Sequence, residues 1–148
     1  MGVTLVMTFE HFEHGADVGV RGRGATAAEA FAGAACALFS LVAEDLGSVR
    51  PETDEHVSCE AEGLDTLLVA FLNELISLAD SRRLVFGAFD VSIRRGASGA
   101  FRVEGRARGE RFDPARHAAT VEPKGATFTE LSVAGEAGRW VAQCVVDV

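Results

Sequence analysis

Hydrophobic and polar residues alternate from the start of the chain in the manner of β-strands. Between residues 7 and 24, apolar positions such as Val18 and Val20 alternate with polar residues or glycine, and a polar break at residues 14–17 divides the segment. A period of two is typical of half-buried strands, whose successive side chains point to opposite faces. The pattern therefore predicts two strands joined at residues 14–17.

A helical pattern follows. Thr26 and Glu29 have the spacing of a capping box, in which each side chain bonds the main-chain N–H of the other residue. Apolar residues then recur at helical spacing as far as Val42, before Gly47. The spacing predicts a helix of about five turns with one apolar face.

The same order of patterns then repeats. Residues 56–62 alternate apolar and charged positions, which predicts a strand. Asp65 is placed to cap a second helix, whose broad apolar face covers residues 67–78 and ends at the charged residues 80–83.

The remainder of the chain is strand-like and is divided by glycine-rich turns. Five strands are predicted, over residues 85–94, 101–108, 119–122, 127–134 and 140–148. Strands on both sides of each helix favour an α+β, two-layer domain, with two main helices packed on a mostly antiparallel sheet. The repeated order permits two similar strand-helix-strand-strand modules, one set inside the other.

Length and charge narrow the class of protein. The 148 residues suit a single domain over residues 1–148 with a core of its own. Fourteen basic against 22 acidic residues give a net charge of −8, which repels nucleic acid and anionic lipid. Three separated cysteines indicate neither a disulfide framework nor a zinc site, and we find neither a membrane span nor a signal peptide. We expect a cytoplasmic protein that binds neither DNA nor membranes.

Familiar catalytic motifs are missing. The sequence at residues 21–24 lacks the spacing of a phosphate-binding loop, and serine hydrolase, zincin and EF-hand patterns are absent. The four histidines are not paired at i, i+4. These absences favour a protein that is not an enzyme.

Two carboxylates stand in unusual places. Asp17 lies beside a turn at the start of an apolar strand, where it either caps the turn or binds a ligand. Asp147 ends an otherwise apolar strand next to the carboxylate of Val148. That end is either a frayed, solvated terminus or a pair of anions held by a divalent cation, because Ca²⁺ and Mg²⁺ prefer clustered carboxylate oxygens.

The basic residues are almost all arginine. Lys124 is the only lysine, which suggests a position that needs a compact ammonium rather than a planar guanidinium. Nine arginines fall between Arg82 and Arg116, so part of the surface is either basic or an ordinary solvated strand face. His117, in the following loop, is interpreted as a structural hydrogen-bonding residue.

In order along the chain, these pieces resemble the archease family over nearly the full length. Residues 12–20 are similar to the family's EHTADIGI opening. The resemblance continues through the helix start at residues 28–31, the helix at residues 67–75, and residues 109–128 to Asp147 and Val148. The resemblance implies two nested strand-helix-strand-strand modules. It also implies an activator of the RtcB-type tRNA-splicing ligase, which uses GTP and Mn²⁺ to join RNA ends with a 3′-phosphate or cyclic phosphate to a 5′-hydroxyl.

The resemblance also implies roles for particular residues. Asp17, Asp147 and the carboxylate of Val148 match metal-associated positions, with Ca²⁺, Mg²⁺ or Mn²⁺ as the ion. Lys124 and His14 are implied as contacts to the partner or its phosphates. Glu29 is a weaker metal candidate, because capping already explains it.

Three positions depart from the family pattern, and each lacks a group that the family has. Gly15 replaces a threonine, Gly125 an alanine and Phe128 a frequent tyrosine.

Three functions are therefore compared. The first is a non-enzymatic activator of an RtcB-type ligase that meets RNA only through the ligase. The second is a general RNA-processing or chaperone-like binding module, motivated by the arginines. The third is a metal-dependent hydrolase using Asp17, Asp147 and His14, for which the sequence offers no nucleophile.

Overall fold

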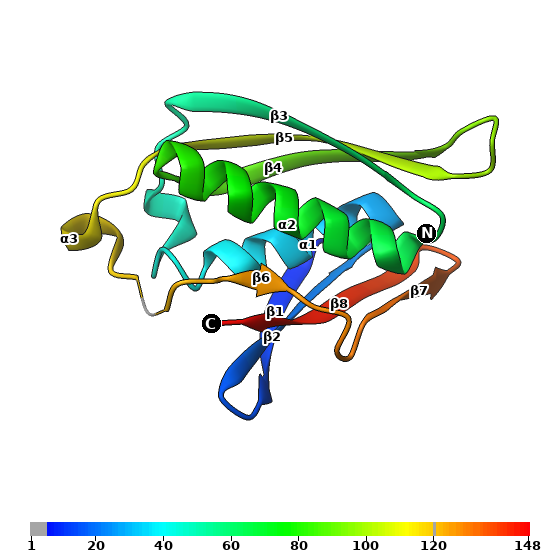
Figure 1. The fold of residues 1–148 in the computed structure, drawn as a ribbon, viewed down its shortest axis with the longest axis horizontal. Coiled ribbons are helices and arrows are strands. Elements are labelled where there is room, and N and C mark those ends of the chain that lie inside the picture. The colour runs from blue at the N-terminus through cyan, green and yellow to red at the C-terminus, as the bar shows by residue number, and fades with distance from the viewer. Residues whose placement is uncertain (1–5, 120) are drawn as a thin grey trace.

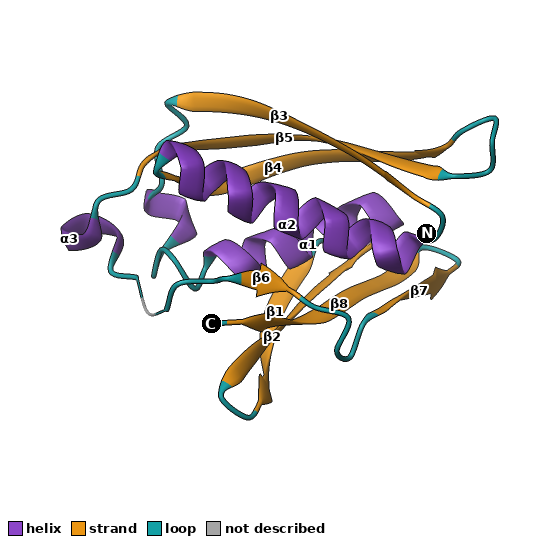
Figure 2. Cartoon of the chain, viewed as in Figure 1, coloured by secondary structure: helices purple, strands orange, loops and turns teal. Residues whose placement is uncertain are grey.

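The computed structural model describes residues 6–119 and 121–148. Figure 2 shows long strands on two sides of a pair of helices. The elements in chain order are β1 (Thr8–His14), β2 (Asp17–Gly24), α1 (Ala27–Phe39), the 3-10 turn η1 (Leu46–Ser48), β3 (Thr53–Ala61), α2 (Leu64–Arg82), β4 (Leu84–Arg95), β5 (Phe101–Arg111), α3 (Pro114–His117), β6 (Gly125–Ala126), β7 (Ser132–Glu136) and β8 (Arg139–Asp147). No helix in the described part of the chain is long and apolar enough to cross a membrane.

The strands form two antiparallel sheets, and both main helices lie between them (Figure 1). One sheet has the order β1-β2-β8-β6, with β7 also paired to β8, and the other has the order β3-β5-β4. The α+β class and the antiparallel pairing are thus confirmed. The single sheet expected from the sequence is divided in two, because α1 contacts both β2 and β4 and so separates the sheets.

The two modules are nested. The inner module, β3-α2-β4-β5, forms the whole three-stranded sheet and is inserted between α1 and β6 of the outer module. A strand cannot pair across the helical layer, so each sheet draws its strands from one module.

Helix α1 begins at the predicted cap. The Glu29 N–H donates to Thr26 Oγ1 over 3.1 Å, as predicted, but the Glu29 carboxylate accepts from the Ala25 N–H at 2.9 Å and not from the expected Thr26 N–H. All residues from Ala30 to Phe39 are buried, because one sheet covers each side of the helix. The prediction that the helix continues to Val42 was wrong: it ends at Phe39, and the next residues form a turn.

Helix α2 follows its apolar face as predicted, but its cap differs. Gly63 occupies the cap position, and Asp65 lies one residue inside the helix, where its carboxylate accepts the Thr66 N–H. The helix ends at Arg82, and the cap residue that follows, Arg83, has a left-handed φ of 55°. Asp65 therefore adds negative charge near the positive end of the helix dipole instead of capping it.

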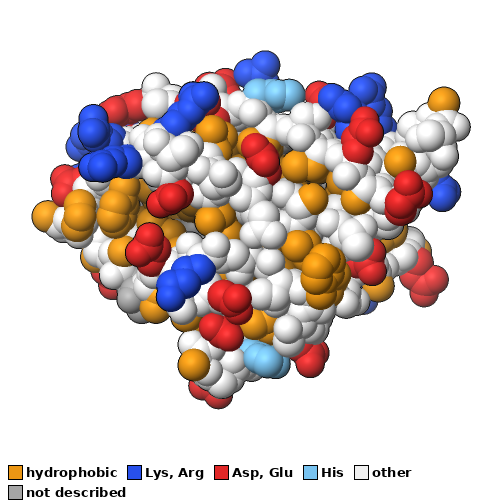
Figure 3. Space-filling model, in the orientation of Figure 1, with side chains coloured by type: hydrophobic (Ala, Val, Ile, Leu, Met, Phe, Trp, Pro, Cys, Tyr) orange, Lys and Arg blue, Asp and Glu red, His pale blue; other side chains and the backbone are white. Residues whose placement is uncertain are grey.

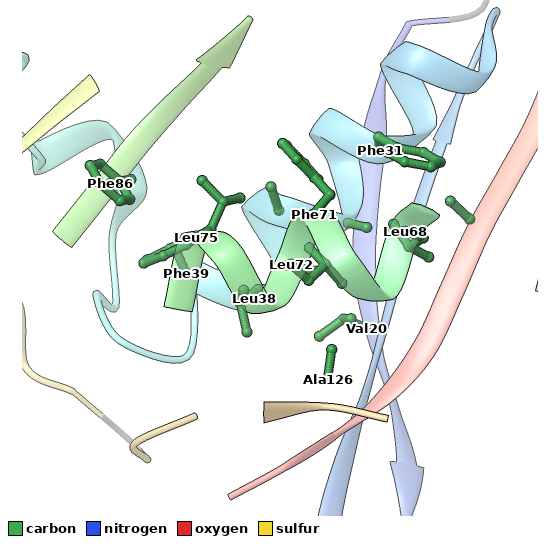
Figure 4. Close-up of a cluster of buried hydrophobic side chains, with 14 of the residues drawn as sticks. Val20, Phe31, Leu38, Phe39, Leu68, Phe71, Leu72, Leu75, Phe86 and Ala126 are labelled. Carbon is green, nitrogen blue, oxygen red and sulfur yellow. The ribbon is translucent and has the colours of Figure 1, made fainter. Parts of the chain in front are cut away.

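The core joins the two modules. Phe31 of α1 lies 5.9 Å from Phe71 of α2, and Phe39 packs edge-on against Phe86 of β4 at 5.3 Å between ring centroids. Figure 4 shows these rings beside the buried leucines of α2. Burial of such side chains contributes about 1.5 to 3 kcal/mol each, so this layer dominates the stability of both modules.

Two predicted strands take other forms. Residues 119, 121 and 122 are not in a strand, and residue 120 lies outside the described residues. The segment expected as one strand over residues 127–134 is a loop followed by β7. Thr127 bonds the Val145 carbonyl with both its N–H and its hydroxyl, at 3.0 and 2.8 Å, and this double contact interrupts regular pairing.

Candidate functional site

The candidate site begins as a row of side chains across one end of the larger sheet. His14 of β1 pairs with Asp17 of β2, and Val18 pairs with Val146 of β8, so the register continues from Asp17 to Asp147. Paired residues in antiparallel strands share a face, with Cα atoms about 4.5 to 5.5 Å apart. The fold therefore brings His14, Asp17 and Asp147 together.

The chain end is bonded to this row. The Val148 N–H donates to Asp17 Oδ1 over 3.3 Å. Asp17 is half-buried, whereas Asp147 and His14 are exposed. The Asp17 carboxylate is consequently held by the end of β8, while solvent reaches the rest of the row.

The hairpin before Asp17 explains one departure from the family pattern. Gly15 has a φ of 61°, a conformation that other residues adopt at a cost, and a Cβ added there would meet nothing within 4 Å. Gly15 and Ala16 form a two-residue turn between β1 and β2. Figure 1 shows this hairpin projecting from the bottom of the molecule, so the turn positions His14 and Asp17 on opposite strands of an exposed tip.

Lys124 lies next to the row, on the side of β8 that faces β6 and not β2. Its main-chain N–H donates to the Asp147 carbonyl at 2.8 Å, and Gly125 pairs with Asp147 in β6. The Lys124 side chain is exposed. A Cβ at Gly125 would meet only Asn73 Oδ1, at 3.5 Å, so the alanine of the family would also fit here.

Asn73 is a site residue that our sequence analysis missed. Its side-chain oxygen accepts the Ala126 N–H at 2.8 Å, and its amide donates to the Ala126 carbonyl at 3.2 Å. The two bonds attach the short strand β6, and with it Lys124, to α2. The available signal was the single side-chain amide in the sequence of α2.

A groove of about 960 Å³ lies beside Lys124. It runs between the second half of α2, the end of α1 and the segment from Arg111 to Lys124, and its lining includes Phe39, Ile76 and Phe112. Lys124 therefore lies where the acidic row and this partly apolar groove meet.

Glu29 is not part of this assembly. Its carboxylate is engaged at the cap of α1, and its Cβ would touch a side chain placed at Gly24. Gly24 is seven residues from Asp17 along β2, a separation of about 23 Å. The structure therefore leaves Glu29 at the opposite end of the sheet.

The oxygen atoms of the row suit a hard divalent cation. Ca²⁺, Mg²⁺ and Mn²⁺ favour carboxylate oxygens, and the row offers the Asp17 and Asp147 side chains beside Val148. Within residues 6–119 and 121–148, however, no three His, Cys, Asp or Glu side chains converge on one point. The side chains thus fit part of a ligand set, which main-chain oxygen, water or a partner must complete.

His117 and Glu110 form a second, buried charged cluster. The Asp113 N–H donates to His117 Nδ1 at 2.8 Å, and His117 Nε2 lies 3.2 Å from Glu110 Oε2 and 2.8 Å from the Arg116 guanidinium. The Arg50 N–H and the Arg116 guanidinium also bind this carboxylate. Burial raises the pKa of Glu110, but these donors outweigh it and lower the pKa to about 2. The predicted structural role of His117 is confirmed.

Most arginines of the central region are paired with acids. Six of the nine form ion pairs: Arg82 with Glu55, Arg94 with Glu104, Arg102 with Glu60 and Glu104, Arg106 with Asp54, Arg108 with Asp90, and Arg116 with Glu110. Figure 3 shows cations mainly along the upper margin, with acids beside them and over the lower half. Exposed pairs of this kind add little stability, but they cancel the positive charge.

The three cysteines are free. Burial raises the pKa of Cys36 to about 11 and that of Cys144 to about 12, and it also raises the pKa of the half-buried Cys59. The expectation that they form no disulfide framework is confirmed. A thiol with such a pKa is a poor nucleophile or metal ligand near neutral pH.

The fold and the row place the chain in a class of α+β proteins that combine two nested modules with carboxylates at the end of a strand. A sequence model of the Archease protein family matches residues 9–148, and the chain belongs to this family. It is 39% identical to "Protein archease" of Pyrococcus furiosus and 40% identical to that of Thermococcus gammatolerans, over 95% of this chain and 98% of each relative. The solution structure of Methanobacterium thermoautotrophicum protein 1598 matches with a TM-score of 0.82 at 28% identity, over 95% of this chain and 98% of that one.

Proposed function

We propose that the protein is a non-enzymatic activator of an RtcB-type RNA ligase, acting in tRNA splicing or RNA repair in the cytoplasm. The observation that carries the proposal is the row of His14, Asp17 and Asp147 at a projecting strand end, in a chain of the archease family. The acidic tip enters the ligase's active-site cleft. RNA is met only through the ligase.

The tip holds one divalent cation, Ca²⁺, Mg²⁺ or Mn²⁺. Asp17, Asp147 and the carboxylate of Val148 supply its oxygen ligands, consistent with the hydrogen bond that places Val148 on Asp17. When bound, the ion supplies positive charge that offsets the charge on phosphate oxygens. Without the ion, neighbouring carboxylates repel each other, so this arrangement is better explained by binding than by stability.

Lys124 contributes a second positive charge. Asn73 holds β6, and the Asp147 carbonyl holds the Lys124 N–H, so the ammonium is presented from a fixed main chain. Formation of a ligase-GMP adduct is a phosphoryl transfer, in which positioning and charge neutralisation supply most of the rate. His14 lies in the same row and contacts the partner or the phosphates. This chain itself makes and breaks no bond.

The test is to mix the protein with its cognate ligase, GTP and Mn²⁺, and to follow the ligase-GMP adduct and multiple turnover. We expect both to rise. Unchanged adduct formation and turnover would refute the proposal.

The alternative is a general RNA-binding module with a chaperone-like role. The ion pairs on the three-stranded sheet argue against it, because they neutralise most arginines between Arg82 and Arg116. Titration with a tRNA-like stem at two salt concentrations separates the two functions. A tight, salt-sensitive complex in the absence of ligase would favour the RNA-binding module.

A further inference from the structure

Phe128 is an aromatic side chain exposed to solvent on the loop between β6 and β7. It is 69% exposed, and of the described residues only Val6 and Phe9 are other large hydrophobic side chains that are also exposed. Phe128 is also absent from the hydrophobic residues that pack against the core. Single exposed apolar residues are common on protein surfaces, so exposure needs support from other observations.

The first of these is the rigidity of the loop. The Thr127 N–H and hydroxyl both bond the Val145 carbonyl, and the Val145 N–H donates to the Thr129 carbonyl at 3.0 Å. The Phe128 carbonyl accepts the Leu131 N–H at 3.3 Å, and the Glu130 carbonyl accepts the Gln143 amide at 3.1 Å. The loop is therefore bonded to β8 on both sides of Phe128. The aromatic ring is presented from an ordered main chain, which lowers the entropic cost of binding.

The second observation is the position of the loop. Gly125 pairs with Asp147, and Phe128 follows three residues later. Paired Cα atoms lie about 5 Å apart and three residues span at most about 11 Å, so the Phe128 Cα lies within about 16 Å of the Asp147 Cα. Phe128 is therefore near enough to the tip for one protein interface to include both.

The third observation is the charge around Phe128, which indicates the kind of partner. Asp17, Glu122, Glu130 and Asp147 lie in or near the tip and the loop. Lys124 and Arg21 are cations nearby, but Arg21, which bonds Gln143 beside Glu130, is paired with Glu10. An acidic surface repels the phosphates of RNA, which disfavours stacking of Phe128 on a base. It attracts a basic protein surface, and aromatic residues are enriched where such surfaces bury their centre.

We infer that Phe128 is a docking anchor that inserts into an apolar pocket beside the basic, phosphate-handling cleft of a protein partner. The inference rests on the proposed function and adds to it the residue that holds the tip in the cleft. Phe128 supplies affinity, whereas Asp17, Asp147 and Lys124 act on the phosphates. The effect of the anchor on affinity can therefore be measured separately from the effect of the row and Lys124 on adduct formation.

The test compares Phe128→Ala with wild type in direct binding to the cognate ligase without RNA, and in adduct formation at saturating protein. We expect the affinity to fall about tenfold or more, as for a truncated aromatic anchor, while adduct formation at saturation is retained. Phe128→Tyr keeps the ring and should bind like wild type.

Phe9→Ala is the matched control, because Phe9 is also exposed but lies on β1, which β2 separates from β8 and from the loop that carries Phe128. It should bind the ligase like wild type, with all variants keeping the wild-type melting temperature. Unchanged affinity of Phe128→Ala, in a wild-type protein that does activate the ligase, would overturn the inference alone. Binding of each variant to an RNA with a 3′-phosphate is measured as well. If Phe128→Ala binds the ligase like wild type but loses binding to this RNA, the inference is overturned in favour of base stacking. A wild-type protein that does not activate the ligase would overturn the proposed function and this inference together.

Discussion

The main-chain N–H of Val148 donates a hydrogen bond to Asp17 Oδ1 over 3.3 Å, although 131 residues separate the two in sequence. The contact arises because β8 is the antiparallel neighbour of β2. The strand pairing therefore brings the start of β2 next to the end of β8. The cation between them stays a prediction, which the following experiments address.

Asp147→Ala should abolish activation of the ligase and leave the fold intact. The side chain is exposed at the end of β8, so its loss removes a ligand oxygen and little buried surface. A C-terminal extension beyond Val148 should have the same effect, because it converts the carboxylate into an amide. Adduct formation and the melting temperature measure the two properties.

The control for this pair is Asp90→Ala, an exposed aspartate paired with Arg108 on the other sheet. It should activate like wild type. If Asp147→Ala and the extended chain both activate fully, the terminal carboxylates have no part in the function.

Lys124→Ala should lower activation by at least about tenfold, as expected for loss of a charge that neutralises phosphate. Lys124→Arg should not restore it, because a planar guanidinium cannot replace a compact ammonium at a single fixed point. The side chain is exposed, so both variants should melt like wild type. Equal activation by Lys124→Arg would show that positive charge alone suffices.

Asn73→Ala should lower the free energy of unfolding by about 1 to 3 kcal/mol, because it leaves the Ala126 N–H and carbonyl without their partners. Activation should also fall, since β6 no longer holds Lys124. Urea unfolding and adduct formation report the two effects. Glu74→Ala, at an exposed neighbour on α2, should change neither, and an equally active Asn73→Ala would remove Asn73 from the site.

The stability of the protein should depend on the charge of Glu110 at acid pH. Its pKa is about 2 in the folded protein against a usual 4.5, so the folded state favours the carboxylate. The resulting stabilisation is complete above pH 4.5 and is lost as the pH falls from 4.5 towards 2. Urea midpoints measured across this range should fall for wild type.

Glu110→Gln should be less stable than wild type at neutral pH and should show a smaller fall in this range. Glu52→Gln, at an exposed carboxylate, should follow wild type. Parallel pH curves for wild type and Glu110→Gln would show that the buried cluster does not favour the charged form.

Local patterns in the sequence determined several elements of both modules and the identity of the family. The turn at residues 14–17, the capping box of Thr26 and Glu29, and the apolar face of α2 could be predicted because each depends on residues a few positions apart. Boundaries were less certain. The end of α1 and the cap of α2 were misplaced, because the contacts that decide them come from elsewhere in the fold.

Only the tertiary structure decided how the sheets divide and which residues meet. Strand periodicity shows that a strand is half-buried but does not identify its neighbour, so the separation of the two sheets by α1 could not be predicted from it. Asn73 is a single amide in an apolar helix until Ala126, 53 residues later, supplies both of its partners. The acidic row has the same origin: Asp17 and Asp147 become neighbours only because β8 returns to pair with β2, a contact between residues that are far apart along the chain.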